Sequence, residues 1–291
     1  MSDSNTPASG RDAAVGQQPA VQSSAADAAL GGASSGAALA GTLEAWWTRL
    51  PRLVLTWALA FDALWLFIYV IGVRFFSKSP DAAFLMSLER EGNPSTWWYG
   101  SQQLLVALVF LCLATRLFDS VDRIRRFRAL FTMSALGFGF ISLDEVGQIH
   151  EMGSRLIVLY RPIGKFLEDF EHHVFHVKHR VHGGGVWIVV YSVIGVLVLI
   201  WLIPQLIRAF REWPREVLLV GAGFIVFAIS AVVLQVYGYF TKVGTFKHTA
   251  YVFVSQGLKM SGISVCLYGA LLVLSAGAIA LTRSLATPPA E

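Results

Sequence analysis

The sequence predicts an all-α polytopic membrane protein with six transmembrane helices and both termini in the cytoplasm. The first observation is composition: the chain of 291 residues is 55% hydrophobic and only 14% charged, whereas a soluble domain carries about 25% charged residues. The second is that the apolar residues form long blocks. The third is that arginines concentrate in alternate loops between those blocks.

Six apolar blocks are each long enough to cross a hydrocarbon core of about 30 Å. Backbone polar groups in lipid need partners within their own segment, so the blocks are expected to be helices. The expected spans are about 53–73, 99–117, 129–159, 186–206, 217–239 and 249–281. Together they form a bundle over residues 42–283, with a short tail at 284–291.

Residues 1–41 precede the bundle and consist mainly of Ala, Ser, Gly and Gln. Such a composition buries too little apolar surface to offset chain entropy, so we expect a disordered tail. It also lacks the basic and apolar regions of a signal peptide. The first span is therefore expected to act as its own insertion signal.

The arginines predict the orientation of the bundle, because loops rich in Lys and Arg stay in the cytoplasm. They lie before span one, between spans two and three, and between spans four and five, which are on one side in a six-span chain. These arginines are Arg49, Arg52, Arg116, Arg123, Arg125, Arg126, Arg128, Arg208, Arg211 and Arg215. We expect a bacterial inner-membrane protein in contact with the lipid bilayer. The net charge of +4 follows from this bias and does not indicate nucleic-acid binding.

Acidic residues lie inside the third span, in the stretch ISLDEVGQIHE at residues 141–151. Ionisable residues within a membrane span are costly, so they suggest a function. On a helix that continues to residue 159, polar side chains spaced by four, three and four residues share one face. This stripe consists of Asp144, Gln148, Glu151 and Arg155, with Glu145 and His150 on its flanks.

Other spans are expected to bring polar groups to the same depth, in the outer half of the bundle. The expected polar cluster comprises Asp62, Asp144, Glu145, Gln148, His150, Glu151, Arg155, Gln235, Gln256 and Lys259. One interpretation is a buried ion-pair network that fixes helix register, with Lys259 as the counter-ion of the third span. A second is a metal or catalytic site on Asp144, Glu145, His150 and Glu151. A third is a proton or ion path.

Five of the seven histidines lie in the loop between spans three and four, which is expected to be periplasmic. On a helix, part of this set lines one face with spacing that can hold Zn²⁺, Cu²⁺ or Ni²⁺. The alternative is a solvated amphipathic segment. The candidate metal ligands are Glu168, His172, His173, His176, His179 and His182.

The stretches Ile141–Glu151 and Glu91–Ser101 resemble motifs of a largely uncharacterised group of bacterial multi-pass membrane proteins. That group carries L-S-L-D-E-x4-H-E in its third span and a related E-x-N-x-P-[ST]-W entry into its second. Its last span tends to carry E-E-G-x-E-M, where this chain has Ser255–Met260, without the acids. The resemblance brings no established activity.

Three functions remain open. The first is a non-enzymatic binding or accessory membrane subunit, acting with other membrane subunits. The second is a membrane-embedded metal-dependent enzyme, and the third is a proton or ion conductor. The chain contains no nucleotide-binding loop or nucleophile elbow, so ATP-driven transport or serine hydrolysis would need another subunit.

Overall fold

The computed structural model describes residues 20–76, 78–88, 93–149, 152, 165, 186–234, 237 and 245–286, which contain helices and no strands. Six helices in this part of the chain are long and apolar enough to cross a membrane. They are α1 (Ala20–Phe75), α3 (Pro94–Ala114), α5 (Arg128–Gly147), α8 (Val186–Glu212), α9 (Pro214–Ala228) with its π-helical continuation η2 (Ile229–Leu234), and α11 (Phe246–Ala286). The predicted all-α, six-span fold class is confirmed.

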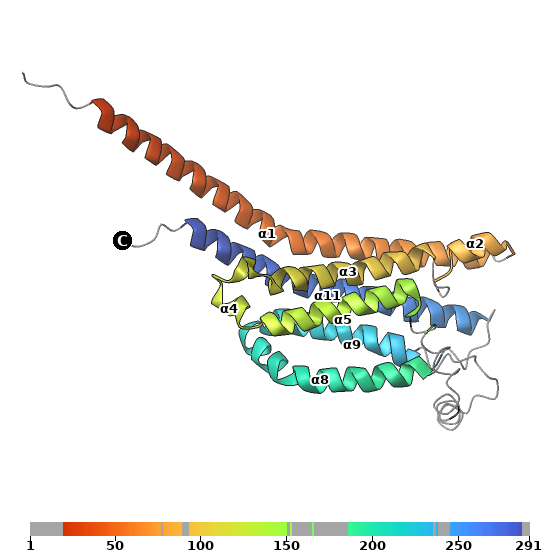
Figure 1. Cartoon of the computed structure of the whole chain (residues 1–291). Helices are drawn as coiled ribbons and strands as arrows, with labels where there is room; N and C mark the ends of the chain where they lie inside the picture. Colours follow the sequence, from red (N-terminus) through yellow and green to blue (C-terminus); the bar gives the residue numbers. More distant parts are fainter. Residues whose placement is uncertain are drawn as a thin grey trace, which may run out of the picture.

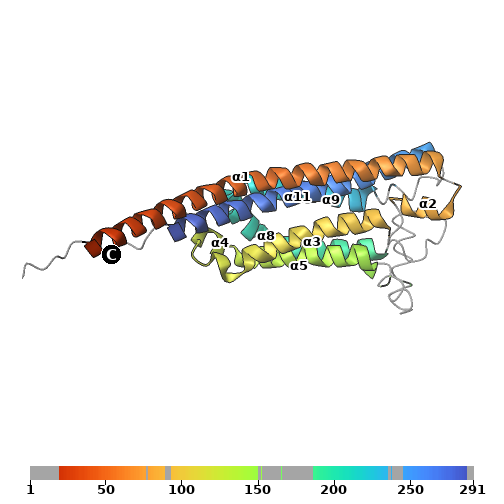
Figure 2. The same ribbon diagram turned by 90° about the horizontal axis from the view of Figure 1, so that it is seen from above.

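The long helices run side by side, and α11 lies at the centre of the bundle (Figures 1 and 2). It contacts α1, α3 and α9. Small residues allow the close approach of α9: a Cβ on Gly223 would lie 2.5 Å from the Gly262 carbonyl oxygen. Close backbone packing through small residues is how membrane helices associate without a hydrophobic driving force.

Helix α3 packs against α5 through a stack of phenylalanines and through interhelical hydrogen bonds. Phe110 stacks on Phe131 and Phe138, with ring centroids 6.1 and 6.0 Å away. The Ser142 hydroxyl donates to the Gly100 carbonyl at 2.7 Å. Helix α8 is peripheral: it contacts mainly α9, and its described side chains from 193 to 200 are all exposed.

Helix α1 is longer than a bilayer requires and extends beyond the bundle (Figure 1). It contains Pro51, and proline removes a backbone hydrogen bond and bends a helix. At this end of the molecule, which also holds α4 (Asp122–Arg125), Arg283 of α11 donates two 2.9 Å hydrogen bonds to Glu44 of α1. The expected boundary of the N-terminal tail, residue 41, falls inside α1, since the helix begins at Ala20.

The third span differs from the expected continuous helix over 129–159. Helix α5 ends at Gly147, because Gln148 has left-handed backbone angles, φ 54° and ψ 36°, and caps the helix through its N–H on the Asp144 carbonyl. A non-glycine residue in this conformation is uncommon and interrupts a helix. Helix α5 therefore does not carry the expected stripe beyond Gln148, and its other members, Glu151 and Arg155, lie outside the described residues.

The two short elements α2 (Pro80–Leu85) and η1, a 3-10 helix (Arg116–Phe118), lie at opposite ends of the bundle. Helix α2 precedes α3, whereas η1 connects α3 towards α4 on the arginine-rich side. Arg123 of α4 pairs with Glu212 at the end of α8, at 3.0 Å. The predicted gathering of these arginines on one side fits this arrangement, while the side of the membrane on which they lie stays a prediction.

Candidate functional site

A buried carboxylate on α1 joins three helices. Asp62 is only 4% exposed. Its Oδ1 accepts hydrogen bonds from Trp98 Nε1 and Gln102 Nε2, both at 2.9 Å, and its Oδ2 accepts from the Ser264 hydroxyl at 2.7 Å. Gln102 Nε2 also lies 3.0 Å from Ser264 Oγ. We call Asp62, Trp98, Gln102 and Ser264 the Asp62 site.

The start of α3 places two of these donors on one face. Asn93 caps the helix by accepting from the Thr96 N–H at 2.9 Å, and Pro94 follows at the first helical position. The Asn93 amide also donates to the Ser87 carbonyl at 2.5 Å, which fixes the cap to the preceding loop. Trp98 and Gln102 are four residues apart, so both face α1 and α11.

The adjacent face of α3 carries a second polar pair, Tyr99 and Gln103. Tyr99 is 3% exposed, and its hydroxyl lies beside the Glu145 carboxylate of α5. Gln103 is fully buried beside the same hydroxyl. Neither polar atom of its amide has a hydrogen-bond partner of ordinary geometry in the described part of the chain.

Among the residues that the structure describes, Asp144 is a second deeply buried carboxylate, at 7% exposure. It accepts a 3.1 Å hydrogen bond from the Tyr191 hydroxyl, so it connects α5 to the peripheral helix α8. Phe140, one turn earlier on α5, packs edge-on against the Tyr191 ring at 5.8 Å. We call Asp144, Glu145, Tyr99 and Tyr191 the Asp144 site.

The structure places the expected cluster residues in three groups. Asp62 belongs to the Asp62 site, while Asp144 and Glu145 belong to the Asp144 site. Gln148 and Gln256 are both half-buried, Gln148 at the end of α5 and Gln256 on α11. Four further residues of the predicted cluster lie outside the described residues: His150, Glu151, Arg155 and Gln235.

The expected partners of Lys259 are only partly described: Asp144 and Glu145 lie in α5, whereas Glu151 lies outside the described residues. The Lys259 ammonium group lies over the ring of Tyr99, 5.8 Å from the centroid, within the range of a cation–π interaction. No ion pair recorded among the described residues includes Lys259. The same ring carries the hydroxyl that lies beside Glu145, so Tyr99 separates Lys259 from this acid, and an ion pair of Lys259 with Glu151 stays a prediction.

Of the residues named for a metal site, the structure describes only Asp144 and Glu145. In the described part of the chain, no group of three or more His, Cys, Asp or Glu side chains is placed to hold a metal ion. The candidate ligands Glu168, His172, His173, His176, His179 and His182 all lie outside that part. The histidine loop as a transition-metal site therefore stays a prediction.

Sequence reasoning missed the contribution of α3. Aromatic residues at the start of a span are typical of a belt at the membrane interface, and this role suits only Trp97, which is 56% exposed. Trp98 donates to Asp62, and Tyr99 is buried in the bundle. The signal that could have found this face is the adjacent pair Gln102–Gln103 inside an apolar span, four residues after Trp98 and Tyr99.

A second missed contact joins η2 to α11. The Ser230 hydroxyl donates to the Ser255 carbonyl, and both serines are fully buried. Ser230 lies in the π-helical segment, and such segments often occur at functional positions. The contact is a polar link between α11 and η2, in addition to the hydrogen bond from Ser264 of α11 to Asp62.

Comparisons with known proteins give one match. A family model described as Domain of unknown function (DUF8692) matches residues 53–274, from the first apolar block through most of α11. No curated protein and no solved structure matches the chain. The matched part contains both the Asp62 site and the Asp144 site. The chain belongs to the DUF8692 family of domains of unknown function.

Proposed function

We propose that the protein is a non-enzymatic binding or accessory subunit of a bacterial inner membrane, in which the Asp62 site fixes the arrangement of α1, α3 and α11. One observation carries this proposal. A deeply buried carboxylate is surrounded by neutral donors from two other helices, with both of its oxygens occupied.

The character of these contacts favours a structural role over catalysis. A general acid or base must come within hydrogen-bonding distance of a substrate, whereas Asp62 is closed off by three side chains. Among the described residues no ion pair includes Asp62, so its partners are neutral hydrogen-bond donors and not a counter-ion. Hydrogen bonds between membrane helices contribute about 0.6 kcal/mol each on average, so three bonds on one side chain make a substantial link.

The experiment compares two substitutions at Asp62 by thermal unfolding of the purified protein in detergent. Asp62→Asn keeps the shape and retains one carbonyl oxygen for Trp98 and Gln102, while its amide can donate to Ser264 Oγ. Asp62→Ala removes every acceptor. We expect Asp62→Asn to melt close to the wild type and Asp62→Ala to melt clearly lower. Equal melting of all three proteins would contradict the structural role.

A second candidate is a metal-dependent site at the end of α5. The adjacent acids Asp144 and Glu145 lie next to the interruption at Gln148, and both are near tyrosine hydroxyls. His150 and Glu151 would complete the ligand set. Elemental analysis of protein purified without a metal-affinity tag tests this candidate. If the wild type holds a stoichiometric metal and both Asp144→Asn and Glu151→Gln lose it, a metal-dependent site becomes the preferred function.

The proposal includes an orientation with the arginine-rich end in the cytoplasm. Ser120 is exposed at that end, between η1 and α4. In intact spheroplasts, a cysteine at Ser120 should be protected from an impermeant thiol reagent, while a cysteine at His179 should react. The opposite labelling pattern would reverse the topology.

A further inference from the structure

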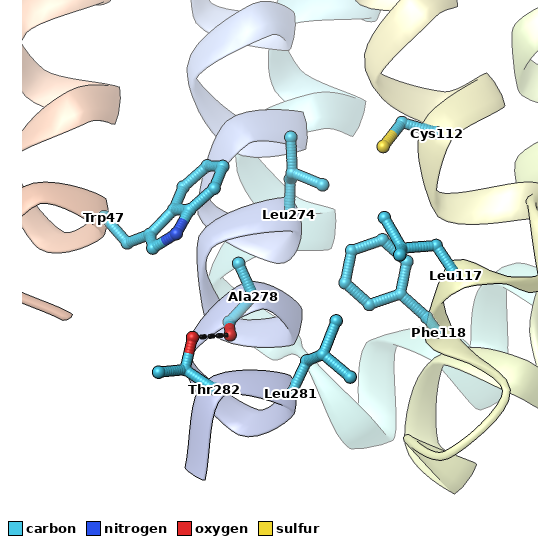
Figure 3. A pocket seen from close by; sticks show the side chains of 8 residues that line it. All are labelled: Trp47, Cys112, Leu117, Phe118, Leu274, Ala278, Leu281 and Thr282. Atoms are coloured by element: carbon cyan, nitrogen blue, oxygen red, sulfur yellow. Dashed lines mark hydrogen bonds between the residues drawn. The ribbon is translucent and has the colours of Figure 1, made fainter. Parts of the chain in front are cut away.

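A cavity of about 190 Å³ lies at the arginine-rich end of the bundle, away from both polar sites. It is lined by α1, by the end of α3 with η1, and by α11, which forms its floor (Figure 3). The lining residues are Trp47, Cys112, Leu117, Phe118, Leu274, Ala278, Leu281 and Thr282.

Apart from the indole N–H of Trp47, the lining offers little to a polar ligand. The Thr282 hydroxyl is used within its own helix, where it donates to the Ala278 carbonyl at 2.9 Å (Figure 3). The other lining side chains are aliphatic, aromatic or a thiol. The cavity is open on one side and its lining is mainly apolar, so a hydrocarbon group is the fitting occupant.

Two groups at the cavity are suited to the polar end of a lipid. Trp47 lines the cavity, and its indole N–H has no hydrogen-bond partner in the part of the chain that the structure describes. An indole commonly anchors at the membrane interface, where its N–H can bond to a lipid carbonyl or phosphate. Arg116 directly precedes the lining residue Leu117, is exposed, and makes no ion pair with a described residue.

The neighbouring arginines differ from Arg116 in this respect. Arg283, next to the lining residue Thr282, is held by Glu44, and Arg128 is held by Asp119. Of the two arginines that directly adjoin a lining residue in the sequence, Arg116 and Arg283, Arg116 is the one that no described carboxylate neutralises. Basic residues at this depth attract anionic headgroups.

We propose that this cavity binds one acyl chain of an anionic phospholipid, with the headgroup phosphate near Arg116 and the ester region near the Trp47 indole. The chain lies between α1 and α3 against α11, in contact with Leu274 and Ala278. The site is separate from the Asp62 site and does not depend on the proposed function.

The test uses full-length protein in nanodiscs with phosphatidylglycerol or phosphatidylcholine that carries a photoreactive diazirine in one acyl chain. Peptide mass spectrometry then locates the cross-links. We expect cross-links to residues 112–118 and 274–282, with phosphatidylglycerol favoured about fivefold, as one arginine near an anionic surface provides. Cross-links spread evenly over the exposed faces of α8 and α9 would overturn the proposal.

Two variants and a control sharpen this test. Arg116→Gln should abolish the preference for phosphatidylglycerol and leave cross-linking by phosphatidylcholine in place. Arg49→Gln is the matched control, because Arg49 is an exposed arginine on α1 two residues from Trp47 and therefore on the other side of the helix. It should change nothing. Ala278→Phe should reduce cross-linking by both lipids. A preference that survives Arg116→Gln, or one that Arg49→Gln removes equally, would refute the assignment of the headgroup.

Discussion

Asp62 and Asp144 are both acidic, both buried in apolar helices, and both in contact with aromatic side chains of other helices. They differ in what they connect. Asp62 accepts from three neutral donors and joins α1 and α3 to α11, the helix at the centre of the bundle. Asp144 accepts from Tyr191 of the peripheral helix α8 and lies near the end of α5.

Buried carboxylates within membrane spans can therefore have different roles in the same protein. Where a carboxylate is enclosed by side-chain donors from packed helices, its loss strands those donors, and the cost appears as stability. Where a carboxylate lies beside a second acid at a helix end, next to a weakly packed helix, it contributes less to stability. Such a position is better suited to binding.

The largest expected effect is the contrast between Asp62→Ala and Asp144→Ala. Asp62→Ala leaves the Trp98 indole and the Ser264 hydroxyl without their acceptor, at a cost of about 3 kcal/mol. Asp144→Ala removes the bond from Tyr191, whose hydroxyl is only partly buried, at a cost of about 1 kcal/mol. Chemical unfolding of both variants in mixed micelles measures the two costs. A larger loss for Asp144→Ala would invert the comparison.

Two neighbouring tryptophans give a matched test of the donors. Trp98→Phe removes the N–H that bonds to Asp62 and should cost about 1 kcal/mol. Trp97→Phe alters an exposed indole that donates to none of the described residues and should leave the melting temperature unchanged. The measurement is differential scanning fluorimetry of the two variants side by side. Equal losses would mean that the Trp98 bond adds nothing beyond ring packing.

The two interpretations of Lys259, a counter-ion of a buried acid or a cation over the Tyr99 ring, predict different losses of stability on its substitution. As the counter-ion of a buried acid, its loss would cost about 3–5 kcal/mol. Over the Tyr99 ring, its contribution is about 0.5–1 kcal/mol. We expect the smaller value for Lys259→Met, with little recovery when Glu145→Gln is added. Strong recovery in the double variant would restore the ion-pair interpretation.

The smallest expected effect is that of Tyr191→Phe, which deletes the hydroxyl bonded to Asp144. A loss of about 0.5 kcal/mol is expected, close to the average for a hydrogen bond between membrane helices. The far-ultraviolet circular dichroism spectrum should not change. A collapse of the helical signal would show that α8 depends on this bond, against its peripheral packing.

The six spans could be predicted from the sequence because they follow from local composition, which decides whether a segment can enter lipid. The end of α5 could not be predicted, since the left-handed backbone of Gln148 is an outlier for a residue type with no special preference for it. The Asp62 site depends on residues 40 and 202 positions away from Asp62 along the chain. Only the packing of α1, α3 and α11 brings them together.

The contribution of α3 to the two polar sites could not be predicted from the sequence for the same reason. Trp98 and Tyr99 are neighbouring aromatic residues that a hydropathy pattern does not distinguish. They point to different faces of α3, so Trp98 contacts Asp62 and Tyr99 contacts Glu145. Helical spacing places Trp98 with Gln102 and Tyr99 with Gln103. Which pair faces α1 and which faces α5 depends on the rotation of α3, set by its cap at Asn93 and its contact at Gly100.

The central claim is that Asp62 stabilises the bundle through shared hydrogen bonds with α3 and α11, and a double-mutant cycle on Asp62→Ala and Ser264→Ala tests it most directly. The four free energies of unfolding in one detergent isolate the interaction of the two side chains. We expect a coupling of about 1 kcal/mol or more, because the double variant removes the donor that Asp62→Ala strands. Additive losses, with no coupling, would contradict the role of Asp62 as a link between helices.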